Sequence, residues 1–230
     1  MNGDAYLALF IAVEDGFYRA LMCAIPCRSF SPARRVRVRT RLCPHGGLGV
    51  TPSPWLAYLR RENRLMYRGI RIGQLFLDRG LPVLFEHPAK VNDRTSPWFE
   101  PRAAGCASIW DVAEMVQLER AGGLRHVEFS QRELGAECFK PTRLLYSRAM
   151  HPVLGPLHGL VGPRLRADAP AVQAYGRDSR GRSRSAATAA YATALCVRAA
   201  DAIALSLQRP EPGTLTPPTV TFTISATREH

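Results

Sequence analysis

The chain has 230 residues, of which 46% are hydrophobic, and this composition excludes a mainly disordered protein. No stretch approaches the ~18 apolar residues that a membrane-spanning helix needs. Acidic residues at positions 4, 14 and 15 interrupt the apolar N-terminal stretch, which is therefore not typical of a secretory signal. We expect an intracellular protein, nuclear or cytoplasmic, without a membrane partner.

The net charge of +12 favours a polyanionic partner, of which nucleic acid is the commonest. Only Lys90 and Lys140 are lysines, and all other basic residues are arginines. A high Arg content with few Lys also arises from GC-rich coding, so the charge leaves two explanations open. If it is functional, we expect weak, salt-sensitive DNA binding without sequence preference, carried by arginines in 34–41 and 60–71.

The first predicted element is a buried strand over 20–25, an apolar run that Pro26 ends. An arginine-bearing loop and a Gly- and Pro-rich segment, 43–54, follow it. The pattern then becomes helical over 56–77, where Gly69 allows close packing.

A second short apolar run, 82–86, precedes His87-Pro88 and predicts the next strand. A strand, a helix and a strand form a βαβ unit, which places the two strands in parallel in one sheet. Further along the chain we expect a helix over 111–121 and strands over 126–129 and 144–146. The predicted fold is α/β: a partial doubly wound parallel sheet with at least three parallel strands, in which 21–25 and 82–86 are neighbours.

The predicted domain organisation has four parts. Residues 1–150 form the α/β domain, and 151–185, which contain Pro, Gly and many charges, form a linker. An alanine-rich helix follows over 186–208, and 209–230 form an irregular tail.

Cys27 comes directly after the first strand and Pro26, at the carboxyl edge of the predicted sheet, where ligands bind in open α/β folds. The many arginines around it favour the thiolate, so we expect a lowered pKa. Glu86 ends the neighbouring strand and projects from the same edge. A thiol and a carboxyl side by side suit addition to an electron-poor ring. The alternatives are an ordinary cysteine at a strand end and a glutamate that caps a helix or pairs with an arginine.

Six cysteines without a paired C-x-x-C motif indicate reduced thiols. A zinc set is conceivable only with unusual spacing, and no metal is expected. Its members would be Cys23, Cys27, Cys43 and His45.

Pro26-Cys27, followed by Phe30-Ser31, resembles the Pro-Cys motif of cytosine-5 DNA methyltransferases, which often continues to Phe-Ser. Glu86-His87-Pro88 is similar to the family's later Glu-Asn motif, with His in place of Asn. Residues 134–143 are similar to a decayed form of its basic motif, in which Lys140 and Arg143 supply the positive charges. With Ala107-Ser108-Ile109-Trp110 between them, these motifs most resemble the degenerate methyltransferase-like domains of mobile-element (retroelement) polyproteins, over about residues 20–205.

The resemblance implies a truncated class I methyltransferase-like fold and a role for each matching residue. Cys27 would add to C6 of a flipped-out cytosine, Glu86 would contact the ring N3, and Lys140 with Arg143 would support the site. S-adenosylmethionine supplies the methyl group in the family. The arginines of the loop would face DNA phosphates; they are Arg28, Arg34, Arg35, Arg37, Arg39 and Arg41.

One departure from the family pattern concerns the methyl donor. The family's Gly-rich donor-binding turn lies well upstream of Pro-Cys, and the residues before Pro26 contain no Phe-x-Gly-x-Gly turn. S-adenosylmethionine binding by this chain is therefore doubtful, and we expect a fragment or an inactive remnant that does not transfer methyl groups. The alternatives are a non-catalytic basic nucleic-acid-binding module of a mobile-element protein and an α/β domain whose arginines reflect codon usage.

Overall fold

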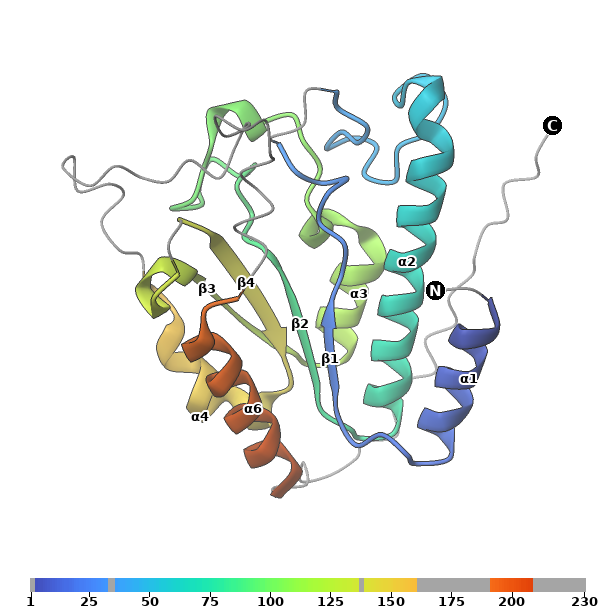
Figure 1. Ribbon diagram of the computed structural model, residues 1–230. Coiled ribbons are helices and arrows are strands. Elements are labelled where there is room, and N and C mark those ends of the chain that lie inside the picture. Colours follow the sequence, from blue (N-terminus) through green and yellow to red (C-terminus); the bar gives the residue numbers. More distant parts are fainter. Residues whose placement is uncertain (1–2, 33–35, 137–138, 161–190, 209–230) are drawn as a thin grey trace, which may run out of the picture.

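The computed structural model describes residues 3–32, 36–136, 139–160 and 191–208, in which helices cover both faces of one sheet (Figure 1). The sheet has four strands in the order β1-β2-β4-β3. Their bounds are Leu21–Ala24 (β1), Val83–Pro88 (β2), Arg125–Ser130 (β3) and Pro141–Tyr146 (β4). The protein is therefore α/β with a mixed sheet.

The predicted neighbours β1 and β2 pair in parallel, with Ala24 opposite Glu86. Helix α2, Ser53–Asp78, connects them. Pro54 suits its first turn, where a missing N–H costs no hydrogen bond, and Gly80, at φ 66°, turns the chain toward β2. The strand-helix-strand prediction is confirmed, with the helix longer than expected.

The prediction of a parallel sheet is wrong for β4, which lies between β2 and β3 and is antiparallel to both. The physical reason is the connection between β3 and β4. Only residues 131–140 separate these strands, with one short 3-10 turn, η3 (Gln131–Leu134). A parallel pairing needs a crossover of about a dozen residues or more, usually a helix, so the chain returns antiparallel.

One face of the sheet packs against α2 and α3, the latter spanning Ala113–Ala121. Phe85 and Leu145 belong to this core. The contact is close at Gly73 of α2, because a Cβ there would overlap the ring of Phe85. The sequence predicted such an approach at Gly69, where a Cβ would lie 3.2 Å from Sγ of Cys23.

The other face packs against the chain beyond residue 150, so the prediction of a linker is wrong for 151–157. These residues form α4 (His151–Leu154) and the 3-10 turn η5 (Gly155–Leu157), with Leu154 and Leu157 fully buried. Helix α6, Thr193–Gln208, packs on the same face. Because these elements share one core with the sheet, the domain extends beyond its expected end. Residues 161–185 of the predicted linker, the expected start of the helix at 186–190 and the predicted tail lie outside the described residues.

Helix α1, Gly3–Glu14, was not predicted. It buries Val13 in the core of the α2 face and leaves Leu7 and Ile11 exposed. Its apolar residues do not follow a clear helical period, which explains why the sequence pattern missed it. Within the described ranges, no helix is both long and apolar enough to cross a membrane.

Candidate functional site

Cys27, Glu86 and Lys140 gather at one edge of the sheet. Cys27 follows the end of β1, Glu86 lies near the end of β2, and Lys140 directly precedes β4. The parallel pairing of β1 with β2 brings their carboxyl ends together, and the antiparallel β4 begins at the same edge. The structure thus brings together three of the four site residues predicted outside the arginine loop.

The carboxyl group of Glu86 is buried, with 5% of the residue exposed. Its Oε2 accepts a hydrogen bond of 2.7 Å from the hydroxyl of Tyr191, just before α6. Its Oε1 is buried and has no hydrogen-bond partner among the described residues. Lys140 lies beside this pair, with Nζ 4.5 Å from the centroid of the Tyr191 ring. Glu86 therefore presents one occupied and one unoccupied oxygen.

Burial raises the pKa of Glu86, while the charge of Lys140 and the hydrogen bond from Tyr191 lower it in part. The balance is an upward shift, which makes the neutral acid more populated than at an exposed glutamate. A neutral carboxyl can donate a hydrogen bond through the oxygen that carries the proton. The site can therefore supply a proton to an acceptor placed near Oε1.

The predicted lowering of the Cys27 pKa is wrong. Burial of the sulfur and the charge of Glu86 raise the pKa of this thiol, Glu62 of α2 adds to the increase, and Lys140 offsets only part of it. The residue as a whole is nevertheless exposed. The prediction failed because burial of the sulfur is the largest cause of the shift, and the charges that act on the thiol are Glu86, Lys140 and Glu62 and not the arginines of the loop.

Arg143 lies on the opposite face of the sheet from Glu86. In the register of β2 with β4, Arg143 is opposite His87, and Glu86 is opposite Leu144. Because neighbouring residues of a strand point to opposite faces, the Arg143 side chain points toward α3. There NH2 lies 3.0 Å from Oε1 of Glu119, and the guanidinium lies 4.8 Å from the Trp110 ring centroid. Arg143 thus stabilises the fold and is not part of the site.

The arginine loop divides into buried and exposed members. Arg39 is 2% exposed, donates from Nε to Oγ of Ser29 at 3.0 Å, and stacks 4.1 Å above the Phe30 ring. The prediction that Arg39 faces phosphates does not fit this burial. The members Arg28, Arg37 and Arg41 are exposed, whereas Arg34 and Arg35 lie outside the described residues.

His87, which stands where the motif that this segment resembles has Asn, is buried on the α2 face. Its ring meets Phe30 and Trp110 edge to face, at centroid distances of 5.5 and 6.0 Å. Burial lowers its pKa to about 3. Phe30 lies three residues after Cys27 in the sequence, so its contact with His87 helps to hold the segment around Cys27 against β2.

Tyr191 is a site residue that sequence reasoning missed as such. It lies 105 positions from Glu86 along the chain. The sequence places Tyr191 inside the alanine-rich helix predicted over 186–208, a position that indicates packing and no hydrogen bond.

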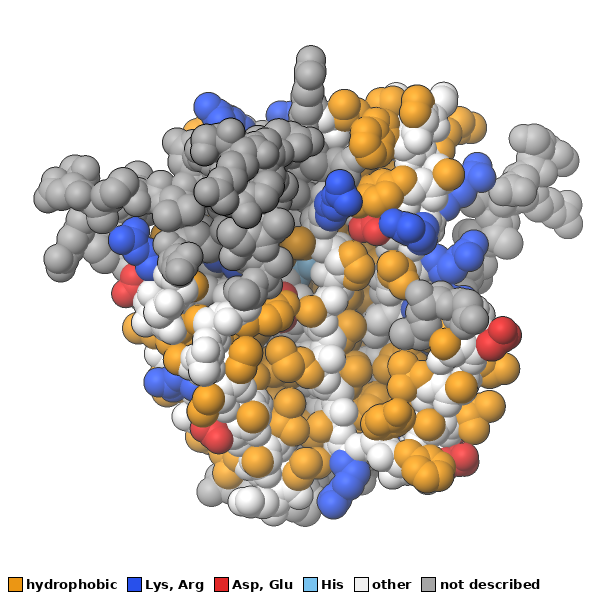
Figure 2. All heavy atoms as spheres, in the orientation of Figure 1, with side chains coloured by type: hydrophobic (Ala, Val, Ile, Leu, Met, Phe, Trp, Pro, Cys, Tyr) orange, Lys and Arg blue, Asp and Glu red, His pale blue; other side chains and the backbone are white. Residues whose placement is uncertain are grey.

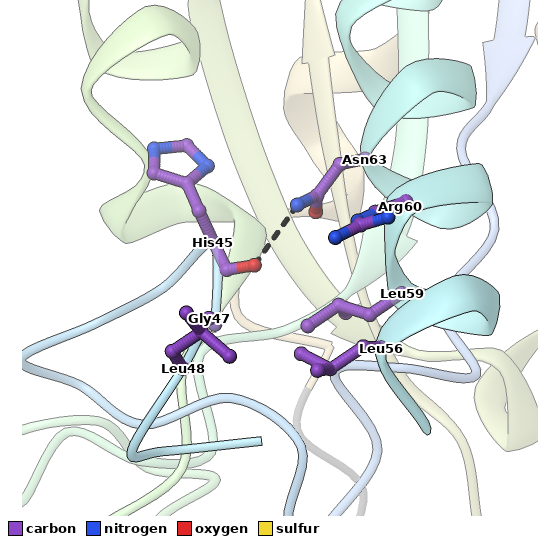
Figure 3. Close-up of a pocket in the computed structure, with 8 residues that line it drawn as sticks. His45, Gly47, Leu48, Leu56, Leu59, Arg60 and Asn63 are labelled. Atoms are coloured by element: carbon purple, nitrogen blue, oxygen red, sulfur yellow. Dashed lines mark hydrogen bonds between the residues drawn. The ribbon is translucent and has the colours of Figure 1, made fainter. Parts of the chain in front are cut away.

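A cavity of about 180 Å³ lies apart from this site, between the loop around His45 and the first turns of α2 (Figure 3). Leu48, Leu56 and Leu59 supply much of its lining, and Nδ2 of Asn63 donates to the carbonyl of His45 at 2.9 Å. The His45 ring also meets Oε2 of Glu114, at 3.6 Å from its Nε2. Across the described part of the chain, no group of three His, Cys, Asp or Glu side chains is arranged to hold a metal ion, the conceived zinc set included.

No family model, curated protein or solved structure matches this chain. The site itself combines the thiol of Cys27, a buried carboxyl group with a raised pKa, and a lysine.

Proposed function

We propose that this chain carries the base-binding half of a cytosine-5 DNA methyltransferase-like site. The observation that carries the proposal is the pair of Cys27 and Glu86 at the ends of adjacent parallel strands, with Oε1 of Glu86 buried and unoccupied. A thiol and an acid at one sheet edge are what addition to a pyrimidine ring requires.

The course of the sheet supports a truncated class I methyltransferase-like fold. Strands β1, β2 and β3 run in one direction, and the last strand, β4, is inserted between β2 and β3 in the opposite direction. An antiparallel last strand in this place resembles the way in which class I methyltransferase sheets end. We propose that β1 to β4 correspond to that half of the sheet.

The proposed step is the addition of the Cys27 thiolate to C6 of the ring. The S–C6 bond forms, the electron pair of the C5=C6 bond moves through the ring toward N3, and N3 takes the proton from Oε1 of Glu86. The raised pKa of Glu86 favours the protonated acid that this step uses. The raised pKa of Cys27 keeps the thiolate scarce, so we expect slow addition. In the family, S-adenosylmethionine then supplies a methyl group to C5.

To test the proposal, the protein is incubated with a DNA strand that carries 2-pyrimidinone. This base is an electron-poor cytosine analogue whose C6 accepts a thiolate without a methyl donor. Intact mass should show a covalent protein–DNA adduct. The adduct should be absent for Cys27→Ala and slow for Glu86→Gln, which removes the acid without changing its shape. The matched control is Cys196→Ala, because Cys196 is also an exposed thiol. No adduct on the wild-type chain, or one that survives in Cys27→Ala, contradicts the proposal.

A second candidate, a non-catalytic nucleic-acid-binding module, is favoured by the arginines of α2. Arg60, Arg61, Arg64 and Arg71 are exposed, and at 100° per residue they lie along one side of the helix. Figure 2 shows basic side chains gathered over the upper part of this side of the molecule. A basic stripe of this kind fits a phosphate backbone.

A further inference from the structure

Tyr191 links the last helix to the predicted acid on one face of the sheet. It precedes α6, whose Leu195 and Ala199 are buried against the face that also holds Leu84. Because this packing holds the start of α6 beside β2, the phenol reaches Oε2 of Glu86 at 2.7 Å. The hydrogen bond joins residues that share no local structure, and its geometry depends on the packed core.

The bond decides which oxygen of Glu86 is left for a ligand. The hydroxyl of Tyr191 donates to Oε2, and burial raises the pKa of Tyr191, so the phenol keeps its proton. Lys140 above the Tyr191 ring adds a cation–π contact that restrains the ring. Of the two oxygens of Glu86, Oε1 is then the one without a partner among the described residues.

We propose that Tyr191 is the positioning residue of the site, which holds Glu86 so that Oε1 faces the ring nitrogen of the bound base. This inference rests on the proposed function, since it concerns the same carboxyl group. It also narrows the ligand to bases whose ring nitrogen at that position accepts a hydrogen bond, as N3 of cytosine does. A base with N–H there, such as uracil, meets the proton of the neutral acid and is disfavoured.

The decisive variant is Tyr191→Phe, which removes the hydroxyl and keeps the ring beneath Lys140. Adduct formation with 2-pyrimidinone DNA should slow by about tenfold, the effect of losing one hydrogen bond that orients a reacting group. The matched control is Tyr146→Phe, because the hydroxyl of Tyr146 also makes a side-chain hydrogen bond, to Nδ1 of His151 at 3.0 Å. This control should leave the rate unchanged.

The pH dependence separates positioning from mere loss of structure. The Tyr191 hydrogen bond lowers the pKa of Glu86, so its removal should raise that pKa further. Plotted against pH, the rate of adduct formation should change slope at low pH, where Glu86 titrates. In Tyr191→Phe this change of slope, the low-pH break, should lie at a higher pH. The other groups around the site remain in the variant, namely Cys27, Lys140, Cys196 and Glu62.

The outcomes distinguish the two proposals. If the wild-type chain forms no Cys27 adduct, the proposed function fails. If the wild-type chain forms the adduct and Tyr191→Phe keeps both its rate and its pH break, the proposed function stands and the role of Tyr191 is wrong. A slower rate without a shifted break also contradicts it, because lost folding would lower the rate alone.

Discussion

Burial of the sulfur is the main reason why the pKa of the Cys27 thiol is raised. The charge of Glu86 and, to a smaller extent, that of Glu62 add to the increase, and Lys140 opposes it. A cysteine with such neighbours reacts slowly with electrophiles at neutral pH, although it is exposed. The exposure of the whole residue and the reactivity of its sulfur are therefore separate properties here.

Glu86→Gln should lower the pKa of Cys27, because it removes the strongest negative charge beside the sulfur. The measurement is the rate of iodoacetamide alkylation against pH, followed at Cys27 by peptide mass in a Cys196→Ala background. Glu62→Gln, as the matched comparison, should shift the profile less. The same Glu86→Gln change should slow addition to 2-pyrimidinone DNA, which needs the acid. An unchanged alkylation profile would mean that the thiol and the carboxyl lie apart in solution.

His87 should make the protein less stable in mild acid. Its folded pKa of about 3 lies below the ordinary value of 6.5, so the unfolded chain binds a proton that the folded chain refuses. Stability is then fully present above about pH 6.5 and decreases as the pH falls toward 3. Between pH 7.5 and 5.0 the loss due to His87 is about 2 kcal/mol.

Urea unfolding of the wild type and of His87→Phe at the two pH values measures this loss. The wild type should lose about 2 kcal/mol more than the variant, while His158→Gln, an exposed histidine, should follow the wild type. The raised pKa of Glu86 acts in the opposite direction but is present in both chains. Parallel losses in wild type and His87→Phe would show that His87 is hydrated in the folded state.

At the scale of elements, the contact of α2 with β2 depends on the missing side chain of Gly73. Gly73→Ala should destabilise the fold by about 1–3 kcal/mol, although alanine favours a helix by about 1 kcal/mol, since the added methyl overlaps the Phe85 ring. The free energy of unfolding, measured by chemical denaturation of the wild type and of Gly73→Ala, checks this loss. Phe85→Leu makes room for the methyl, so the double variant should lose less than the sum of the two single changes. Additive losses would mean that the two residues are not in contact.

The elements themselves were largely predictable, and the direction of β4 was not. Apolar periodicity and the breaks at Pro26 and His87-Pro88 identified β1, α2 and β2, together with their adjacency. Strand direction depends on the length of the connections, and the short segment 131–140 made β4 antiparallel. The prediction of Cys27 and Glu86 as neighbours required only the parallel pair, whereas the contact of Tyr191 with Glu86 depends on how α6 packs on the sheet. The burial of Arg39 and the face of Arg143 likewise depend on tertiary contacts.

At the scale of the whole molecule, only some of the basic residues behind the net charge of +12 are placed where they could contact a nucleic acid. The side chains of Arg39 and Arg143 are buried and make contacts inside the protein. The exposed arginines of α2, in contrast, make no salt bridge with other described residues. If nucleic acid binds, its phosphates should lie along α2.

The triple change Arg60→Ala, Arg64→Ala and Arg71→Ala should weaken binding to single-stranded DNA of any sequence. Each lost phosphate contact should also make the slope of log affinity against log salt shallower by roughly 0.7. Fluorescence anisotropy at several salt concentrations measures both quantities. The matched control replaces three exposed arginines elsewhere, Arg102, Arg120 and Arg125, at equal net charge. Equal losses in the two triple variants would indicate a general charge effect and no binding face.

The packing of α6 also decides at which residue the protein can be truncated without loss of its fold. An expression boundary at Leu160, which the apparent linker suggests, removes the cover from Leu84, Leu144 and Tyr146, and the shortened domain should self-associate through that face. A synthetic peptide of residues 191–208 is too short to be a stable helix alone, but it should fold upon the bare face. The added peptide should then keep the truncated domain from self-associating. Its binding should also restore the hydrogen bond between the hydroxyl of Tyr191 and Glu86.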